Sequence, residues 1–332
     1  MPEIRHNVVT GEWVIVAPNR SQRPGDFATP GRVLTETRPT HVVTCPFCPG
    51  NEAQTPPEVL RLPRSGPWQV RVVPNKFAAL EKEVPREFHC DGLYRHLTGG
   101  GWHEVVIESR QHNATPALQT GEEVARILIA FQERGHEMAH DPQIEHIVYL
   151  KNHGPSAGTS QGHPHGQIVA LPLVPRRVQA RIESSRRYFD ETGRCALCDM
   201  WHAEVARGKR VVAESEDFVA FVPYAAFAAF HTWIVPRRHQ ASFRQADADG
   251  LTDLGGLLRS VLRKIYLGIG DPDYNYAIQS APVGACRSDG LHWYLAITPR
   301  LIPWGGFEME SGMFINTSLP EEDAAFLRKV VV

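Results

Sequence analysis

The sequence predicts an α+β protein built from two related units in tandem. Two histidines recur at an offset of 127 residues, His112 with His239 and His165 with His292. An amphipathic stripe at helical spacing follows position 120 and repeats, at the same offset, after position 247. Two Cys-x-x-Cys pairs are also present, 150 residues apart. A duplicated unit explains all three observations.

Each unit is predicted to contain a strand, a helix and then a pair of strands. The apolar stripe of the first helix is Val124, Ile127, Phe131 and Met138, and that of the second is Leu251, Leu254, Leu258 and Ile265. The expected strands lie at 102–107, 144–150 and 168–171 in the first unit, and at 232–235, 274–278 and 292–297 in the second.

We place the units at residues 1–180 and 194–332, each an antiparallel sheet with a packed helix. The segment 175–193 is rich in Arg and Glu and is predicted to be a helical connector. Because the Cys-x-x-Cys pairs are 150 rather than 127 residues apart, the first unit is expected to carry about two dozen extra residues after its cysteines.

Composition and charge exclude several classes of protein. The longest apolar run is too short for a membrane span, and the first residues lack the basic-then-apolar pattern of a secretion signal. The net charge of -2, with no basic block, argues against nucleic acid as a partner. We therefore expect a cytoplasmic protein with small-molecule partners.

The paired cysteines indicate metal binding. In a chain without a secretion signal disulfides are not expected, and two thiolates at this spacing can share one Zn²⁺. Zinc prefers four ligands, so two more must come from elsewhere in each unit, and the repeated histidines are the candidates. The resulting sets are Cys45, Cys48, His112 and His163 in the first unit, and Cys195, Cys198, His239 and His292 in the second.

Two questions about these metal sets stay open. A redox dithiol is the competing interpretation of each cysteine pair. In addition, the offset of 127 aligns His292 with His165 and not with His163. The unpaired Cys90 and Cys286 are expected to be small buried residues.

The segment 162–167, Gly-His-Pro-His-Gly-Gln, is the strongest functional signal. If it begins a strand, His163, His165 and Gln167 share one face, because strand side chains alternate. The preceding segment 154–162 is small and polar, which suits a backbone that wraps closely round an anion. An imidazole beside such a phosphate site can attack phosphorus.

Together these motifs resemble the galactose-1-phosphate uridylyltransferase family of the histidine-triad superfamily. The resemblance rests on residues 5–24, the Cys-Pro-Phe-Cys-Pro-Gly-Asn-Glu segment at 45–52, Val-Pro-Asn-Lys-Phe at 73–77 and His-Pro-His-Gly-Gln at 163–167. Near the C-terminus, His-Trp-Tyr-Leu at 292–295 and Gly-Gly-Phe-Glu at 305–308 are similar to the compact two-zinc branch, which includes ADP-glucose phosphorylase-like enzymes. The chain departs from the best-known members at Lys76, where they carry Asp.

The resemblance implies two histidine-triad-like units and a role for individual residues. His165 is the expected nucleophile, and Gln167 is expected to donate to the transferred phosphoryl group. The expected substrate contacts are Asn152 and Ser160 for the phosphates, Arg20, Arg23 and Asn75 for the nucleotide, and Gly306, Phe307 and Glu308 for the sugar phosphate. Zinc is implied as a structural cofactor, and a homodimer as the assembly.

The implied function is a ping-pong nucleotidyltransferase. It moves a nucleoside monophosphate, with UMP the leading expectation, from a nucleoside diphosphate sugar to a hexose-1-phosphate through a nucleotidyl-histidine. Two alternatives stay open: an ADP-glucose phosphorylase, which uses inorganic phosphate as acceptor, and a nucleotide hydrolase.

Overall fold

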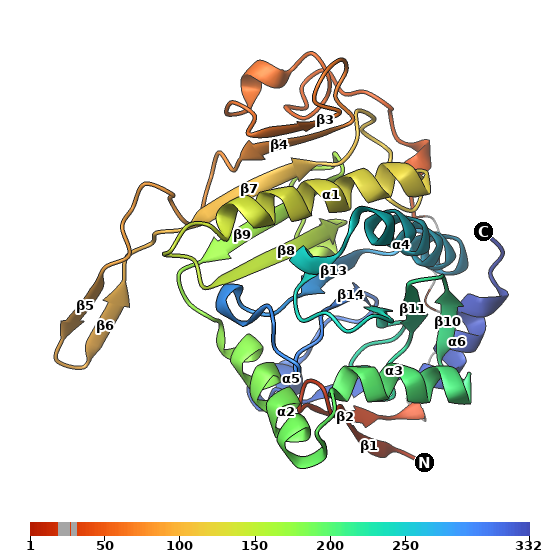
Figure 1. The fold of residues 1–332 in the computed structure, drawn as a ribbon. Coiled ribbons are helices and arrows are strands. Elements are labelled where there is room, and N and C mark those ends of the chain that lie inside the picture. Colours follow the sequence, from red (N-terminus) through yellow and green to blue (C-terminus); the bar gives the residue numbers. More distant parts are fainter. Residues whose placement is uncertain (19–26, 28–31) are drawn as a thin grey trace.

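A single antiparallel sheet of ten strands runs through the protein in the computed structural model, which describes residues 1–18, 27 and 32–332 (Figure 1). The strand order is β10-β11-β12-β14-β13-β8-β9-β7-β4-β3. The strands of the first half are β3 (Leu60–Leu62), β4 (Val70–Pro74), β7 (Trp102–Ile107), β8 (His146–His153) and β9 (His165–Leu171). Those of the second half are β10 (Val211–Glu214), β11 (Phe218–Phe221), β12 (Thr232–Pro236), β13 (Tyr274–Gln279) and β14 (Tyr294–Pro299).

The two halves have matching strand orders and meet at one seam. Outward from the seam, the first half runs β8-β9-β7-β4-β3 and the second runs β13-β14-β12-β11-β10. At the seam, β8 and β13 pair antiparallel, with Leu150 opposite Ala277 and Asn152 opposite Asn275. The predicted α+β class with a duplicated unit is therefore confirmed, and the two sheets are joined into one.

Helices α1 (Gly121–Met138) and α4 (Ala248–Ile269) lie side by side on one face of this sheet (Figure 1). A reciprocal cap fixes the start of α1, because the Thr120 hydroxyl accepts from the Glu123 amide and the Glu123 carboxylate accepts from the Thr120 amide. At the start of α4 the cap is one-sided, since the Asp247 carboxylate accepts from the amide of Gly250. The two helices pack closely at Gly255, where a Cβ atom would lie 2.6 Å from a backbone nitrogen of α1.

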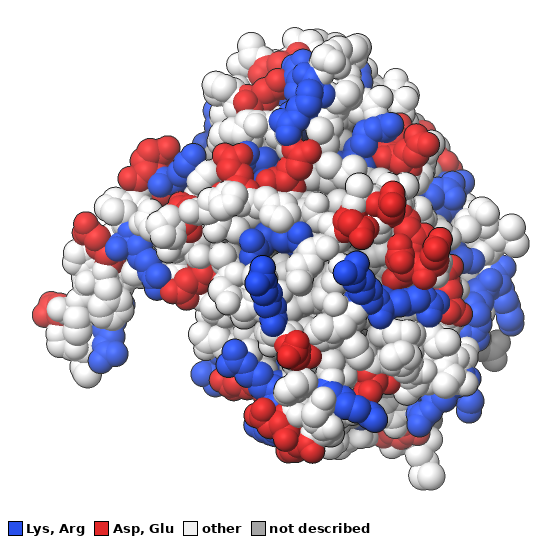
Figure 2. Space-filling model, in the orientation of Figure 1, with Lys and Arg blue, Asp and Glu red and all other residues white. Residues whose placement is uncertain are grey.

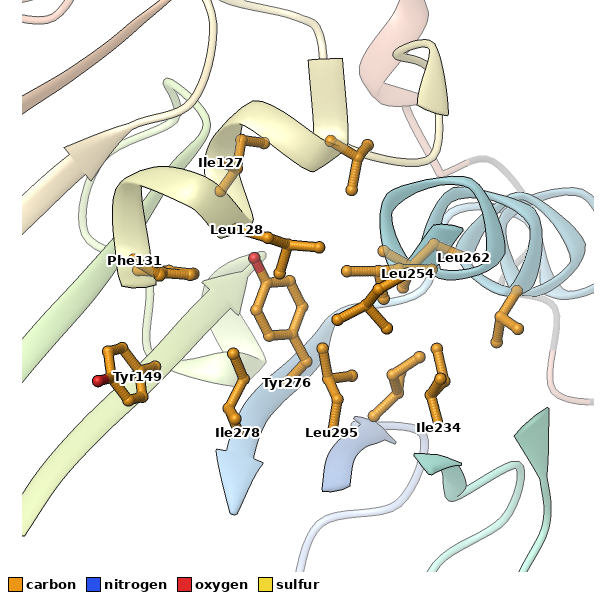
Figure 3. Close-up of a cluster of buried hydrophobic side chains, with 14 of the residues drawn as sticks. Ile127, Leu128, Phe131, Tyr149, Ile234, Leu254, Leu262, Tyr276, Ile278 and Leu295 are labelled. Atoms are coloured by element: carbon orange, nitrogen blue, oxygen red, sulfur yellow. The ribbon is translucent and has the colours of Figure 1, made fainter. Parts of the chain in front are cut away.

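One hydrophobic core crosses the seam beneath these helices (Figure 3). Ile127 and Phe131 of α1 and Leu254 of α4 point at the sheet, where Tyr149 and Tyr276 rise from the two seam strands. All eight residues of the predicted helical stripes are buried. Because each buried aliphatic side chain contributes about 1.5–3 kcal/mol, this shared core binds the halves to each other.

Smaller elements surround the main sheet. β1 (Glu3–His6), β2 (Trp13–Val16) and β15 (Phe314–Asn316) form a three-stranded sheet, and β5 (Phe88–Asp91) and β6 (Tyr94–Leu97) form a hairpin that stands away from the body (Figure 1). The remaining helices are α2 (Arg176–Thr192), α3 (Ala196–Arg207), α5 (Gly306–Ser311) and α6 (Pro320–Lys329). Helix α2 confirms the predicted helical connector.

Figure 2 shows Lys and Arg interspersed with Asp and Glu over the face in view. Across the described ranges, no helix combines the length and the apolarity needed to cross a membrane. The expectation that the two unpaired cysteines are buried is wrong: Cys90 is exposed at the projecting hairpin, which has no core to enter, and Cys286 is half-buried.

Candidate active site and metal centres

The predicted nucleophile lies at the start of β9, next to the seam. His165 and Gln167 are two residues apart on this strand, so both project from one face. His163 precedes the strand, and its Nδ1 instead faces the Sγ atom of Cys48 at 3.6 Å. Strand alternation therefore applies to His165 and Gln167, whereas His163 lies just outside the strand.

The His165 ring has the hydrogen bonding and burial of a neutral imidazole whose Nε2 carries the lone pair. Its Nδ1 lies 2.9 Å from the carbonyl oxygen of His163, so Nδ1–H donates to that oxygen and the lone pair resides on Nε2. Burial lowers the pKa of His165 from its ordinary value, which favours the neutral ring at neutral pH. The ring of Phe47 packs edge-on against the His165 ring, with 5.5 Å between the ring centroids, and restricts the orientation of the imidazole.

A buried ion pair lies directly behind the nucleophile. The Lys151 ammonium contacts the Glu108 carboxylate, with the two side chains 1% and 0% exposed, and Lys151 Nζ lies 3.3 Å from the carbonyl oxygen of His165. Tyr276, from the second half, places its hydroxyl 3.5 Å from Glu108 Oε1. The ion pair thereby supports the backbone of His165, the first residue of β9.

The loop before β9 includes residues 154–162, the predicted phosphate loop. It includes a 3₁₀ turn, η5 (Pro155–Ala157), entered by Gly154 at φ 82°. A Cβ at Gly154 would lie 1.9 Å from Asp273 Oδ1, so glycine is needed for both conformation and space. Asp273 Oδ2 in turn accepts from the backbone amide of Ser156 at 2.6 Å. A carboxylate of the second half thereby fixes the phosphate loop of the first.

A cavity of about 210 Å³ opens beside this loop. Asn152 and Ser160, both predicted to hold phosphates, line it together with His163. Asn152 is oriented across the seam, because its Oδ1 accepts from Asn275 Nδ2 at 2.8 Å and its own amide group is thereby turned away from Asn275. Asn275 also donates to the carbonyl oxygen of Ala157 at 2.8 Å.

Gln167 and Asn75 meet at a third histidine. His103 Nε2 lies 2.8 Å from Gln167 Oε1 and 3.1 Å from Asn75 Nδ2. Asn75 follows β4, and its backbone amide donates to the His103 carbonyl at 2.9 Å. The structure therefore brings together the residues predicted for the phosphoryl and nucleotide ends of the substrate. Lys76 is exposed beside them.

The first predicted metal set converges in space. The ligand atoms of Cys45, Cys48, His112 and His163 all lie within 4.8 Å of one another. His163 Nε2–H donates to the Ser109 carbonyl at 2.8 Å, which leaves Nδ1 for a metal, as is usual for metal-bound histidines. Burial raises the pKa of Cys45, so a thiolate there needs a nearby positive charge such as Zn²⁺.

The second set converges equally well. The ligand atoms of Cys195, Cys198, His239 and His292 also lie within 4.8 Å of one another. Cys198 Sγ is 3.4 Å from Nδ1 of His239 and 3.3 Å from Nδ1 of His292. Each cysteine pair lies close to two histidine nitrogens. This arrangement fits a closed Cys2His2 metal site better than a redox dithiol.

Strand register explains why the offset of 127 aligns His292 with His165 rather than with the metal-set residue His163. Tyr149 and Tyr276, buried on the same face, match at the offset of 127. Leu150 pairs with Gln167, and Ala277 pairs with Ala296, so β9 matches β14 at an offset of 129. The second loop is two residues longer, and His292 is the counterpart of His163. The counterpart of His165 is Tyr294.

The roles of five predicted residues stay predictions. Arg20 and Arg23 lie outside the described residues. Gly306, Phe307 and Glu308 belong to α5, and the cavity beside the phosphate loop includes none of them. Phe307 is 46% exposed, and Glu308 accepts from the amide of Gly305 at 2.9 Å.

Sequence reasoning missed the residues that support the site. These are His103, Glu108, Lys151, Asp273 and Asn275. For Lys151, Asp273 and Asn275 the available signal was the polar character of 151–153, at the end of β8, and of 271–275, which leads into β13. A buried Lys or Asn within a strand indicates a polar partner opposite, but the sequence does not say which one.

Comparisons with known proteins agree with this geometry. Residues 1–175 match the family model for the galactose-1-phosphate uridyl transferase N-terminal domain, and residues 181–302 match that for the C-terminal domain. The chain is 38% identical to an ADP-glucose phosphorylase of Arabidopsis thaliana over 99% of its own length and 93% of that protein's. It is 27% identical to a galactose-1-phosphate uridylyltransferase of Thermotoga maritima, over 100% of this chain and 99% of that one.

Solved structures give the same result. A crystal structure of an Arabidopsis thaliana ADP-glucose phosphorylase with bound ADP-glucose superposes with a TM-score of 0.84 at 35% identity, covering 100% of this chain and 99% of that one. A uridylyltransferase structure superposes with a TM-score of 0.75 at 25% identity, covering 99% and 97%. The chain therefore belongs to the galactose-1-phosphate uridyl transferase family and is an enzyme of that transferase family.

Proposed function

We propose that this enzyme transfers a nucleoside monophosphate from a nucleoside diphosphate sugar to a phosphate-bearing acceptor, with His165 as the covalent carrier. The observation that carries the proposal is the His165 ring. It is buried, burial lowers its pKa, its Nδ1–H donates to the His163 carbonyl, and it follows the predicted phosphate loop.

In the first step, Nε2 of His165 attacks the α-phosphorus. The bond from that phosphorus to the bridging oxygen breaks, and the sugar phosphate leaves with the electron pair. It is already a stable anion, so it needs no strong general acid. Gln167, Ser160 and the amides of 154–162 are the proposed donors to the phosphoryl oxygens as negative charge shifts among them.

In the second step, an oxygen of the acceptor phosphate attacks the same phosphorus from the side opposite the phosphorus–nitrogen bond. The phosphorus–nitrogen bond breaks, and the lone pair returns to Nε2. Throughout, Nδ1–H stays on the His163 carbonyl, so the ring leaves the cycle in the tautomer with which it began. Zinc, bound by the two Cys2His2 sets, supplies positive charge that stabilises the thiolates and clamps each half.

Two acceptors are compatible with this chemistry. Our leading proposal is a hexose-1-phosphate acceptor with UMP as the transferred group. The second candidate is inorganic phosphate with ADP-glucose as donor. It is favoured by the 38% identity to an ADP-glucose phosphorylase and by Lys76, where the best-known uridylyltransferases carry Asp. Hydrolysis is the third outcome to test.

Further parts of the proposal concern substrate contacts, assembly and location. We propose that Arg20, Arg23 and Asn75 contact the nucleotide and that Gly306, Phe307 and Glu308 contact the sugar phosphate. We also propose a homodimer, and a cytoplasmic location because both Cys2His2 sets need reduced thiols. The division into units at 1–180 and 194–332 remains a prediction.

The test is a donor screen with α-³²P-labelled UDP-glucose and ADP-glucose. The protein is denatured and washed, and the retained label is located by mass spectrometry. We expect one donor to label His165. The variant His165→Ala should retain none, while His89→Ala, on the projecting hairpin, should label normally. Unlabelled protein with both donors would argue against the proposal, and release of monophosphate without any acceptor would favour a hydrolase.

A further inference from the structure

We propose that His103 is a positioning residue that fixes which way the Gln167 amide points, and thereby supplies a phosphoryl-oxygen donor to the reaction. The inference rests on the proposed function for its catalytic consequence. Its structural basis is the hydrogen-bond geometry on β7 and β9.

The two side chains are neighbours because of strand register. Val105 of β7 lies directly opposite Gln167 of β9. His103, two residues before Val105, projects from the same face and is the diagonal neighbour of Gln167. Both side chains are half-buried, so their polar atoms bond to each other with limited competition from water.

A backbone amide determines the tautomer of His103. The Ala79 N–H donates to His103 Nδ1 at 3.1 Å, and a backbone amide cannot reverse its role as a side-chain amide can. Nδ1 must therefore carry the lone pair, and the proton of the neutral ring resides on Nε2. That nitrogen lies 2.8 Å from Gln167 Oε1, so Nε2–H donates to the Gln167 carbonyl oxygen.

With Oε1 held by His103, the NH₂ group of Gln167 is directed away from the ring. A glutamine turned the other way would place its NH₂ against an N–H donor, which is unfavourable. The Gln167 amide hydrogens are thus available to a phosphoryl oxygen next to His165.

The same tautomer affects Asn75. Asn75 Oδ1 accepts from the Phe77 amide at 2.9 Å, so its Nδ2 faces His103 Nε2 at 3.1 Å. Since Nε2 is protonated, this contact is not a hydrogen bond, and the Asn75 amide hydrogens also remain available to a ligand. The His103 ring thus orients Gln167, whereas the Phe77 amide orients Asn75.

Two conservative variants separate the functions of the ring. In His103→Asn, the side-chain oxygen can still accept from Ala79 near the position of Nδ1, but nothing reaches Gln167. In His103→Gln, the terminal NH₂ can still donate to Gln167. We expect the rate of nucleotidyl-enzyme formation to fall about tenfold in His103→Asn, with KM nearly unchanged, and by less than about threefold in His103→Gln.

A double-mutant cycle distinguishes positioning from a general structural role. In a Gln167→Ala background, His103→Asn should cost no further rate, because its effect passes through Gln167. The inference would be overturned if His103→Asn lowered the rate of nucleotidyl-enzyme formation as much in the Gln167→Ala background as in wild type. A wild-type rate in His103→Asn alone would also overturn it.

The tautomer itself is tested without turnover. Nitrogen NMR of ¹⁵N-histidine protein should show protonation of His103 at Nε2 and a lone pair at Nδ1, and the reverse pattern overturns the inference. Wild-type protein that forms no nucleotidyl-enzyme refutes the proposed function instead, and the NMR result then still decides whether His103 orients Gln167.

Discussion

The buried pair of Lys151 and Glu108 gives the sharpest test of how the nucleophile is supported. Both side chains are almost fully excluded from water, at 1% and 0% exposure. Among the described residues, replacing Lys151 with Met leaves the Glu108 carboxylate with only the Tyr276 hydroxyl at 3.5 Å. Removing one member of a buried pair costs about 3–5 kcal/mol, a large share of a total stability of about 5–15 kcal/mol.

The double variant Lys151→Met with Glu108→Leu should be more stable than Lys151→Met alone. It leaves no unpaired charge, and an apolar pair of similar volume is often as stable as the ion pair it replaces. The exposed pair Arg64 and Glu133 is the matched control, and Arg64→Met should cost no more than about 1 kcal/mol.

The assay is urea unfolding of five proteins, followed by labelling of His165 in those that fold: wild type, Lys151→Met, Glu108→Leu, their double variant and the control Arg64→Met. Because Lys151 Nζ also touches the His165 carbonyl at 3.3 Å, we expect the double variant to regain stability but to label more slowly than wild type. A cost below about 1 kcal/mol for Lys151→Met, or simple additivity of the two single variants, would refute the reasoning.

Three further predictions address the metal centres, the helix packing and a buried acid. Cys48→Ser should lower both the zinc content and the melting temperature, and Cys90→Ser on the hairpin should change neither, as read by metal analysis and thermal melts. Gly255→Ala should cost about 1–3 kcal/mol in urea unfolding because its Cβ would overlap the α1 backbone, while the adjacent Gly256→Ala, with open space, should cost nothing. Burial raises the pKa of Asp323 to about 7, so the folded state holds a proton that the unfolded state has released. This contribution to stability is complete at low pH and is lost as pH rises through about 7; the urea midpoint of Asp323→Asn should therefore rise relative to wild type between pH 5 and 8, and parallel curves would contradict this.

Much of the fold was predictable because the duplication repeats local patterns. Helical stripes such as Val124 to Met138 depend on local spacing, and each buried stripe needs a sheet to cover. The metal sets were predictable for a related reason. Cysteines paired as Cys45 and Cys48 need two more ligands, and few histidines were available at matching positions.

The seam and its polar contacts could not be predicted in this way. Pairing of β8 with β13 depends on which edges of the two sheets remain open, and nothing in either strand alone states this. The contacts of Asn275 with Asn152 and of Asp273 with the phosphate loop follow from that pairing. Likewise, the orientation of Gln167 depends on the amide of Ala79, which is distant in the sequence.

The register at the seam also explains why the two halves are not equivalent. The counterpart of His165 is Tyr294, which stacks on Trp233 at 4.1 Å, and the counterpart of Gln167 is Ala296. The second half keeps a Cys2His2 set but has no nucleophile and no amide at these positions. What it contributes to the proposed reaction is support across the seam, through Asn275 and through Asp273. A substitution of Asn275 or Asp273 should therefore slow His165 labelling, although both residues lie in the half without a nucleophile. If the two halves worked as independent units, such a substitution would leave the labelling rate unchanged.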